Sequence, residues 1–205
     1  MKIGHILLFL SPILLLGGCS TSTNGAQINR NTVHIPSEAT EAEKVAGVLA
    51  QANGFADEGD MLALATALRA LEGLGARAAN QGVDDVQKSD PISNWRLLAD
   101  AELQKLPPYR GRTLGPAYAN GQLEPGQNIT IGQVFMGGRT ANVALSVSSN
   151  EPLNMTVTGA KNIAVCDHRP IGKQQCKWVP LFTERYSIKI DNVGKKAVKY
   201  YLAVD

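Results

Sequence analysis

Cysteine and histidine are the residue types in this 205-residue chain whose spacing bears most directly on chemistry. Cys166, His168 and Cys176 fall within one short stretch, and Asp167 could add a fourth metal ligand, but the spacing matches no usual zinc pattern. Asp167 and His168 could also assist a distant serine, although a loop histidine beside an aspartate is usually solvated. The sequence has no nucleophile elbow, no zinc-protease helix motif and no phosphate-binding glycine loop. We therefore expect no catalytic residue, no metal site and no cofactor.

The remaining cysteine, Cys19, closes an apolar stretch at the start of the chain. After a positive start at Met1-Lys2, residues 6–16 have the apolar length of a signal peptide and are too short to span a bilayer. Leu16-Gly17-Gly18-Cys19 resembles the lipobox of bacterial lipoprotein precursors. The resemblance implies cleavage before Cys19, acylation of Cys19 and attachment to the membrane, with Ser20 favouring the outer membrane. An ordinary secretory signal cut elsewhere is the alternative.

If Cys19 carries lipid, Cys166 and Cys176 remain as an even pair in an exported protein. A disulfide between them would stabilise the fold by roughly 2 to 3 kcal/mol, because it restricts the unfolded chain. We favour the disulfide over the metal site because the compartment is oxidising. The bond would join the ends of two neighbouring strands.

The periodicity of apolar residues divides the rest of the chain. Between 38 and 106 it follows a period of 3.6, which predicts two to three helices. Asn53-Gly54 is expected to end the first helix, Asp57 or Asp60 to begin the second, and Asp90-Pro91 to begin the third. The expected organisation is a signal peptide (1–18), a flexible tether (19–37), a helical region (38–106), a Pro/Gly linker (107–126) and a β domain (127–205).

From Gln127 onward the apolar period changes to two. Short strands separated by turns about every 8 to 12 residues predict an antiparallel β-sandwich or jelly roll. The fold class is therefore expected to be α+β, with an N-terminal helical segment followed by the sandwich.

The β domain contains the segments Phe135-Met136-Gly137-Gly138, Val143–Val147, Tyr186–Ile190 and Tyr200–Val204. Over about residues 125–205, these four segments resemble the bacterial pre-peptidase C-terminal domain. The resemblance implies a non-catalytic module that binds, targets or stabilises. The chain differs from that family at Leu153-Asn154-Met155-Thr156, where an acidic strand is usual.

Charge and aromatic content limit the possible partners. The 20 basic residues nearly balance the 18 acidic ones, and only 5% of residues are aromatic, so we expect no nucleic-acid partner. One hypothesis is an outer-membrane lipoprotein, anchored through Cys19 and facing the periplasm or the cell surface, whose sandwich binds an envelope protein or glycan. The other is an accessory or regulatory subunit of a secreted hydrolase. Trp178 and Tyr186 are the candidates for an exposed ligand surface, although both lie in expected strands and favour the core.

Overall fold

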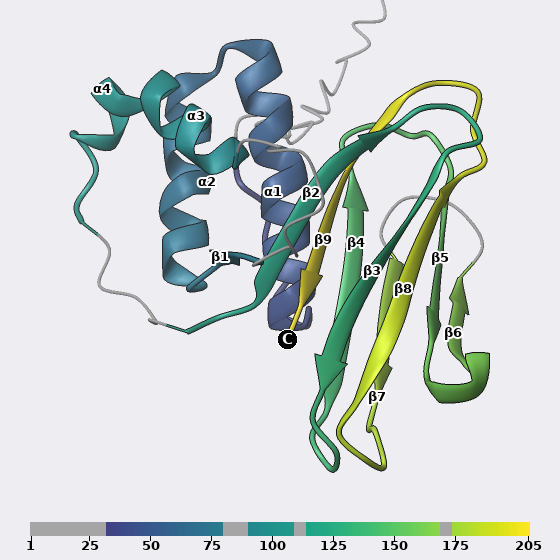
Figure 1. The fold of residues 1–205 in the computed structure, drawn as a ribbon. Helices are drawn as coiled ribbons and strands as arrows, with labels where there is room; N and C mark the ends of the chain where they lie inside the picture. Colours follow the sequence, from purple (N-terminus) through teal and green to yellow (C-terminus); the bar gives the residue numbers. More distant parts are fainter. Residues whose placement is uncertain (1–31, 80–89, 109–113, 169–173) are drawn as a thin grey trace, which may run out of the picture. The chain divides into compact units, whose positions relative to one another are not determined.

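The computed structural model describes residues 32–79, 90–108, 114–168 and 174–205, which belong to one compact unit. Within these ranges helices come mainly first and strands mainly later, which confirms the expected α+β class. The helical part contains four helices rather than two to three, because the expected third helix is divided at Ala99, whose backbone departs from helical geometry. The helices are α1 (Glu41–Glu58), α2 (Met61–Gly73), α3 (Pro91–Leu98) and α4 (Asp100–Leu103), with a 3-10 turn η1 (Ala160–Asn162) among the strands (Figure 1).

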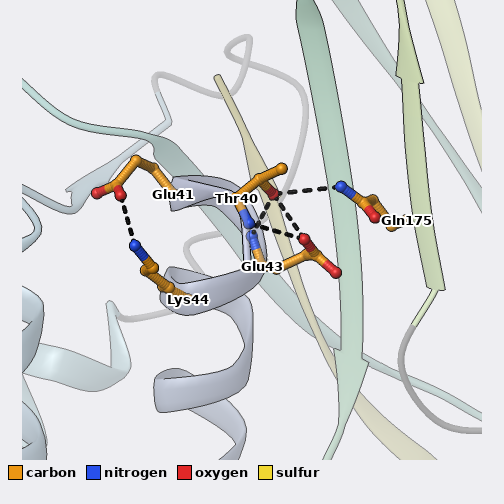
Figure 2. Close-up of polar contacts among 5 residues, drawn as sticks. All are labelled: Thr40, Glu41, Glu43, Lys44 and Gln175. Atoms are coloured by element: carbon orange, nitrogen blue, oxygen red, sulfur yellow. Dashed lines mark hydrogen bonds and ion pairs between the residues drawn. The ribbon is translucent and has the colours of Figure 1, made fainter. Parts of the chain in front are cut away.

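Helix α1 begins at a capping box that also contacts the sheet. The Glu43 amide donates to Thr40 Oγ1 at 3.3 Å, and the Thr40 amide donates to Glu43 Oε2 at 2.8 Å. Gln175, in a strand far along the chain, donates its side-chain amide to Thr40 Oγ1 at 3.4 Å (Figure 2). Because the box satisfies otherwise unpaired amides, the start of α1 is fixed beside that strand.

Asn53-Gly54 does not end the first helix, so that prediction is wrong. Helix α1 continues to Glu58 and ends at Gly59, whose φ of 75° gives a left-handed cap. Asn53 remains helical and donates to Asp57 Oδ2 at 2.7 Å. Glycine within a helix costs only about 1 kcal/mol, which the burial of the neighbouring Ala52 and Phe55 offsets. Asp60 then caps α2 by accepting from the Ala63 amide.

The described residues contain nine strands, which form two sheets packed as a sandwich, and this confirms the expected architecture. All pairings are antiparallel except that of the short first strand, β1 with β2. One sheet has the order β1 (Arg77–Ala78), β2 (Ala117–Leu123), β9 (Val198–Val204), β4 (Ala141–Val147) and β7 (Gln174–Trp178). The other has the order β3 (Asn128–Phe135), β8 (Glu184–Asn192), β5 (Leu153–Thr158) and β6 (Ala164–His168).

Two segments expected to be irregular are ordered in the structure. Residues 117–123, inside the expected linker, form β2 and pair along their whole length with β9. Residues 32–37, the end of the expected tether, lie along α1. There the His34 amide donates to Gln51 Oε1 at 2.7 Å, and Gln51 Nε2 donates back to the His34 carbonyl at 2.9 Å. Hydrogen bonds to distant residues, from the β9 backbone in one case and from the Gln51 side chain in the other, order both segments.

The described residues form three layers, the helices and the two sheets, and an apolar core lies between each adjacent pair. The first lies between the sheets and is formed mainly by alternate residues of β4, β5, β8 and β9. The second lies between the helices and the outer face of the β2–β9–β4 sheet, where Tyr118, Ala144 and Tyr201 belong to one buried cluster with residues of α1, α2 and α3. Figure 1 shows the helices on this one face. The helical and β segments therefore share a core.

Helix α3 is fixed to the sheet through its first residues. Asp90 accepts from the Ile92 amide at 3.1 Å, and Pro91 occupies the first helical position, as the sequence predicted. The buried Tyr118 hydroxyl of β2 donates to Asp90 Oδ1 at 2.6 Å. Burial and this hydrogen bond raise the pKa of Tyr118 well above its ordinary value, so the hydroxyl keeps the proton it donates.

Candidate interaction surface

Two turns lie side by side at one end of the sandwich, seen at the bottom of Figure 1. The β3–β4 turn and the β7–β8 turn are joined by the Gly138 amide, which donates to the Pro180 carbonyl at 2.8 Å, and by the Gly137 amide, which donates to Thr183 Oγ1 at 3.0 Å. A Cβ on Gly137 would lie 2.9 Å from the Phe182 Cα, so only glycine permits this approach. The two turns therefore form one connected surface.

This end of the sandwich exposes large apolar side chains. Leu181 is 86% exposed and Phe182 is 76% exposed, on a turn anchored at both ends by the hydrogen bonds above. Folding normally places such side chains inside, so adjacent exposed ones mark interaction sites more often than chance. We call the exposed apolar set the sandwich-end surface; it consists of Val134, Met136, Val179, Leu181 and Phe182.

An aromatic cluster lies in the sandwich core next to this surface. The Phe135 ring lies 4.8 Å from the Trp178 ring and 5.8 Å from the Tyr186 ring, and Trp178 lies 5.1 Å from Tyr186, measured between ring centroids. Tyr186 is only 3% exposed and Trp178 is half-buried. The two residues expected as a possible ligand surface thus pack against each other, because inward-facing strand positions direct their rings into the core. Because Trp178 ends β7 and Tyr186 lies near the start of β8, their packing fixes both ends of the β7–β8 turn.

Basic side chains surround the apolar residues. Lys177, Arg139 and Arg185 are exposed next to the two turns, whereas Glu184 is half-buried. Arg139 also lines a cleft of about 420 Å³, together with Arg77 of β1 and Asp205. The cleft borders Val134 and Met136, so it continues the sandwich-end surface. The whole end combines an apolar centre with a mainly basic rim.

The predicted disulfide is present, joining Cys166 to Cys176 with their Cα atoms 6.0 Å apart. Cys166 lies in β6 and Cys176 in β7, so the bond connects the edges of the two different sheets. The sequence predicted that the bond would join the ends of two neighbouring strands. In the structure β6 and β7 follow each other along the chain but belong to different sheets, so the bond links the two sheets. The edge at β7 is also where Gln175 contacts the start of α1.

Replacing both Cys166 and Cys176 by alanine is expected to lower the free energy of unfolding by roughly 2 to 3 kcal/mol, since the unfolded chain regains the entropy of an open loop. For a chain of this length the midpoint of thermal unfolding should fall by about 5–10 °C. Calorimetry of both proteins, with a reductant-treated wild type as the matched reference, measures the change. An equal midpoint in all three samples would contradict a stabilising role.

The other residues expected from the sequence are distributed as follows. Cys19 lies outside the described residues. His168 ends β6, where its backbone pairs opposite Met155. Among the side chains that the structure describes, no three histidine, cysteine, aspartate or glutamate residues gather as a metal site would require. In the same described ranges, no helix is both long enough and apolar enough to cross a bilayer.

The residues that form the sandwich-end surface were not singled out in the sequence. Pro180-Leu181-Phe182 lies between two strands and interrupts their alternation, so consecutive apolar residues in a turn were the available signal. Whether such residues are buried under a neighbouring turn depends on the tertiary structure.

No family model matches the chain, and no curated protein matches it. Several solved structures are similar to part of the chain. They include the periplasmic inhibitor of g-type lysozyme PliG from Aeromonas hydrophila, at 16% identity over 44% of this chain and 84% of that chain, with a TM-score of 0.35. The Yersinia pseudotuberculosis-derived mitogen has 15% identity over 44% and 84%, with a TM-score of 0.38.

The pre-peptidase C-terminal domain of a Bacillus anthracis collagenase is also among them. It has 9% identity over 44% of this chain and 89% of that domain, with a TM-score of 0.36. Each of these similarities covers under half of this chain. What those proteins bind or inhibit does not transfer to this one.

Proposed function

We propose that this chain is a lipid-anchored, non-catalytic lipoprotein of the bacterial outer membrane whose sandwich-end surface docks a protein partner. The exposure of Leu181 and Phe182 on a fixed turn is the observation that carries the proposal. Aromatic and large aliphatic side chains that enter a partner's pocket supply much of the free energy of protein binding. The turn needs little further ordering before it binds, which reduces the entropic cost.

Charge indicates the kind of partner. Lys177, Arg139 and Arg185 favour an acidic rim on the opposing protein, since complementary charges speed association and reject basic surfaces. The partner's centre would be an apolar pocket that accommodates Phe182. A lipid anchor at Cys19 would confine the domain to the membrane surface and raise its effective concentration near a partner there.

Photo-crosslinking tests the proposal in the full chain. A photoreactive phenylalanine analogue at position 182 should form a covalent adduct with one protein species in intact membranes. The same analogue at Leu97, which is 79% exposed on α3 away from these turns, should not capture that species. The captured protein is then purified, and its binding to the purified wild-type chain is measured directly. Adducts with lipid alone, or equal capture from both positions, would overturn the protein-docking proposal.

A further inference from the structure

A second pocket lies where α3 meets the helix-covered face of the sheet, built separately from the sandwich-end turns. It has a volume of about 300 Å³, at the small end of the range for ligand pockets. Its walls come from α1, α3, β2 and β9. Asn120 and Gln122 of β2 stand opposite Tyr201 and Lys199 of β9 in the antiparallel register, so four pocket residues occupy adjacent places on one sheet face.

Uncharged polar groups without partners line this pocket. Within the described residues, the side-chain amides of Asn94 and Asn120 form no hydrogen bond. The Trp95 indole N–H and the Tyr201 hydroxyl also lack a partner among these residues, yet neither atom is sealed from solvent. Burial, followed by the charge of Asp57, raises the pKa of Tyr201, so its hydroxyl remains protonated and able to donate. The pocket therefore offers several donors and acceptors to a ligand.

The charges at the pocket are compensated internally. Lys199 Nζ donates to Asn53 Oδ1 at 3.1 Å and lies 3.7 Å from Asp57 Oδ1. This places the one lysine of the pocket lining beside a carboxylate. A ligand carrying a formal charge would have no free counter-charge in the lining, so a neutral molecule suits the pocket better.

The pocket is formed before any ligand arrives. Trp95 is 6% exposed and Tyr201 3% exposed, and their ring centroids lie 6.2 Å apart, so both rings are packed in the core beneath the pocket. Asp90 holds the start of α3 to Tyr118 in β2, which fixes the spacing between the helix and the sheet. A pocket whose walls are already packed favours rigid, hydroxyl-rich ligands, because little conformational entropy is lost on binding.

We propose that this pocket binds one or two rings of a neutral saccharide. Hydroxyl groups can both donate to and accept from amides, which matches Asn94 and Asn120. The Trp95 indole N–H and the Tyr201 hydroxyl, which also belong to residues of the pocket lining, add two donors for sugar hydroxyls. The inference does not depend on the protein-docking function, since the pocket shares no residue with the sandwich-end surface.

Binding of maltotriose, cellotriose and tri-N-acetylchitotriose to the purified full chain tests the proposal. The protein is kept in a detergent without a sugar headgroup, and binding is followed by calorimetry and ligand-observed NMR. At least one trisaccharide should bind with a millimolar or tighter Kd. Asn94→Ala and Asn120→Ala should each raise that Kd by about tenfold, the effect of losing one neutral hydrogen bond.

Asn128→Ala is the matched control, because Asn128 is an exposed amide of β3 outside the pocket, and it should leave the Kd unchanged. No binding of any of the three trisaccharides to the wild type would overturn the proposal. So would binding that Asn94→Ala and Asn120→Ala leave unaltered. A chain altered at Leu181 and Phe182 should still bind the trisaccharide, so this pocket and the docking surface can fail independently.

Discussion

Replacing Cys19 by alanine is expected to move essentially all of the protein from the membrane fraction to a soluble or unprocessed form. Each buried methylene group of an acyl chain contributes about 0.8 kcal/mol, so removing two or three chains removes stable anchoring. Fractionation of cells and metabolic labelling with a fatty-acid analogue measure the two consequences, release and loss of acylation. The Cys166–Cys176 disulfide should still form, because both residues lie in the folded unit.

Ser20→Ala is the matched control, since it alters the neighbouring residue and leaves the Cys19 thiol in place. It should still be labelled and should still sediment with membranes. The expectation of membrane attachment rests on the resemblance of Leu16-Gly17-Gly18-Cys19 to a lipobox, and these four residues lie outside the described ranges. A Cys19→Ala protein that is processed normally and remains with the membranes would show that another part of the chain supplies the attachment.

The change Leu181→Asp combined with Phe182→Asp is expected to weaken binding of the captured partner by at least about 30-fold, the effect of losing a buried aromatic anchor worth 2 kcal/mol or more. The midpoint of thermal unfolding should hardly change, because both side chains are largely exposed in the free protein. Binding is measured between purified proteins, with calorimetric unfolding of each variant as the check on folding.

Leu97→Asp is the control for this pair, as it places one of the same aspartates, half of the added charge, at an equally exposed apolar position on α3. It should bind the partner like the wild type. If the Leu181 and Phe182 variant binds normally, the partner does not use the sandwich-end surface. A large loss with Leu97→Asp as well would mean that added negative charge, rather than lost apolar contact, weakens binding.

The sequence predicted those features that depend on residues close together in the chain. Asp90-Pro91 predicted the start of α3, because capping depends on amides within the same turn. Strands from 128 onward were predicted by their period of two, since one face of each strand is buried in the sandwich. The Cys166–Cys176 pair followed from the count of cysteines.

Long-range pairing explains the errors. Asn53-Gly54 has a turn-like composition, yet the packing of α1 on the sheet keeps it helical. Residues 117–123 have little apolar alternation and lie among prolines and glycines, but β9 supplies backbone partners along the whole segment. Secondary-structure propensity is a property of a segment by itself, whereas these two segments are ordered by contacts with residues far away in the sequence.

The sequence by itself determined the α+β class, the sandwich and the disulfide pair, because periodicity, caps and cysteine number are properties of the chain. Only the tertiary structure decided which side chains could meet a ligand. Trp178 and Tyr186, the aromatic candidates, face inward, whereas Leu181 and Phe182 lie on a turn that nothing in the described chain covers. The saccharide pocket likewise needs α3 and the β2–β9 face together. Exposure depends on which distant segments pack together, and that is set by the fold as a whole.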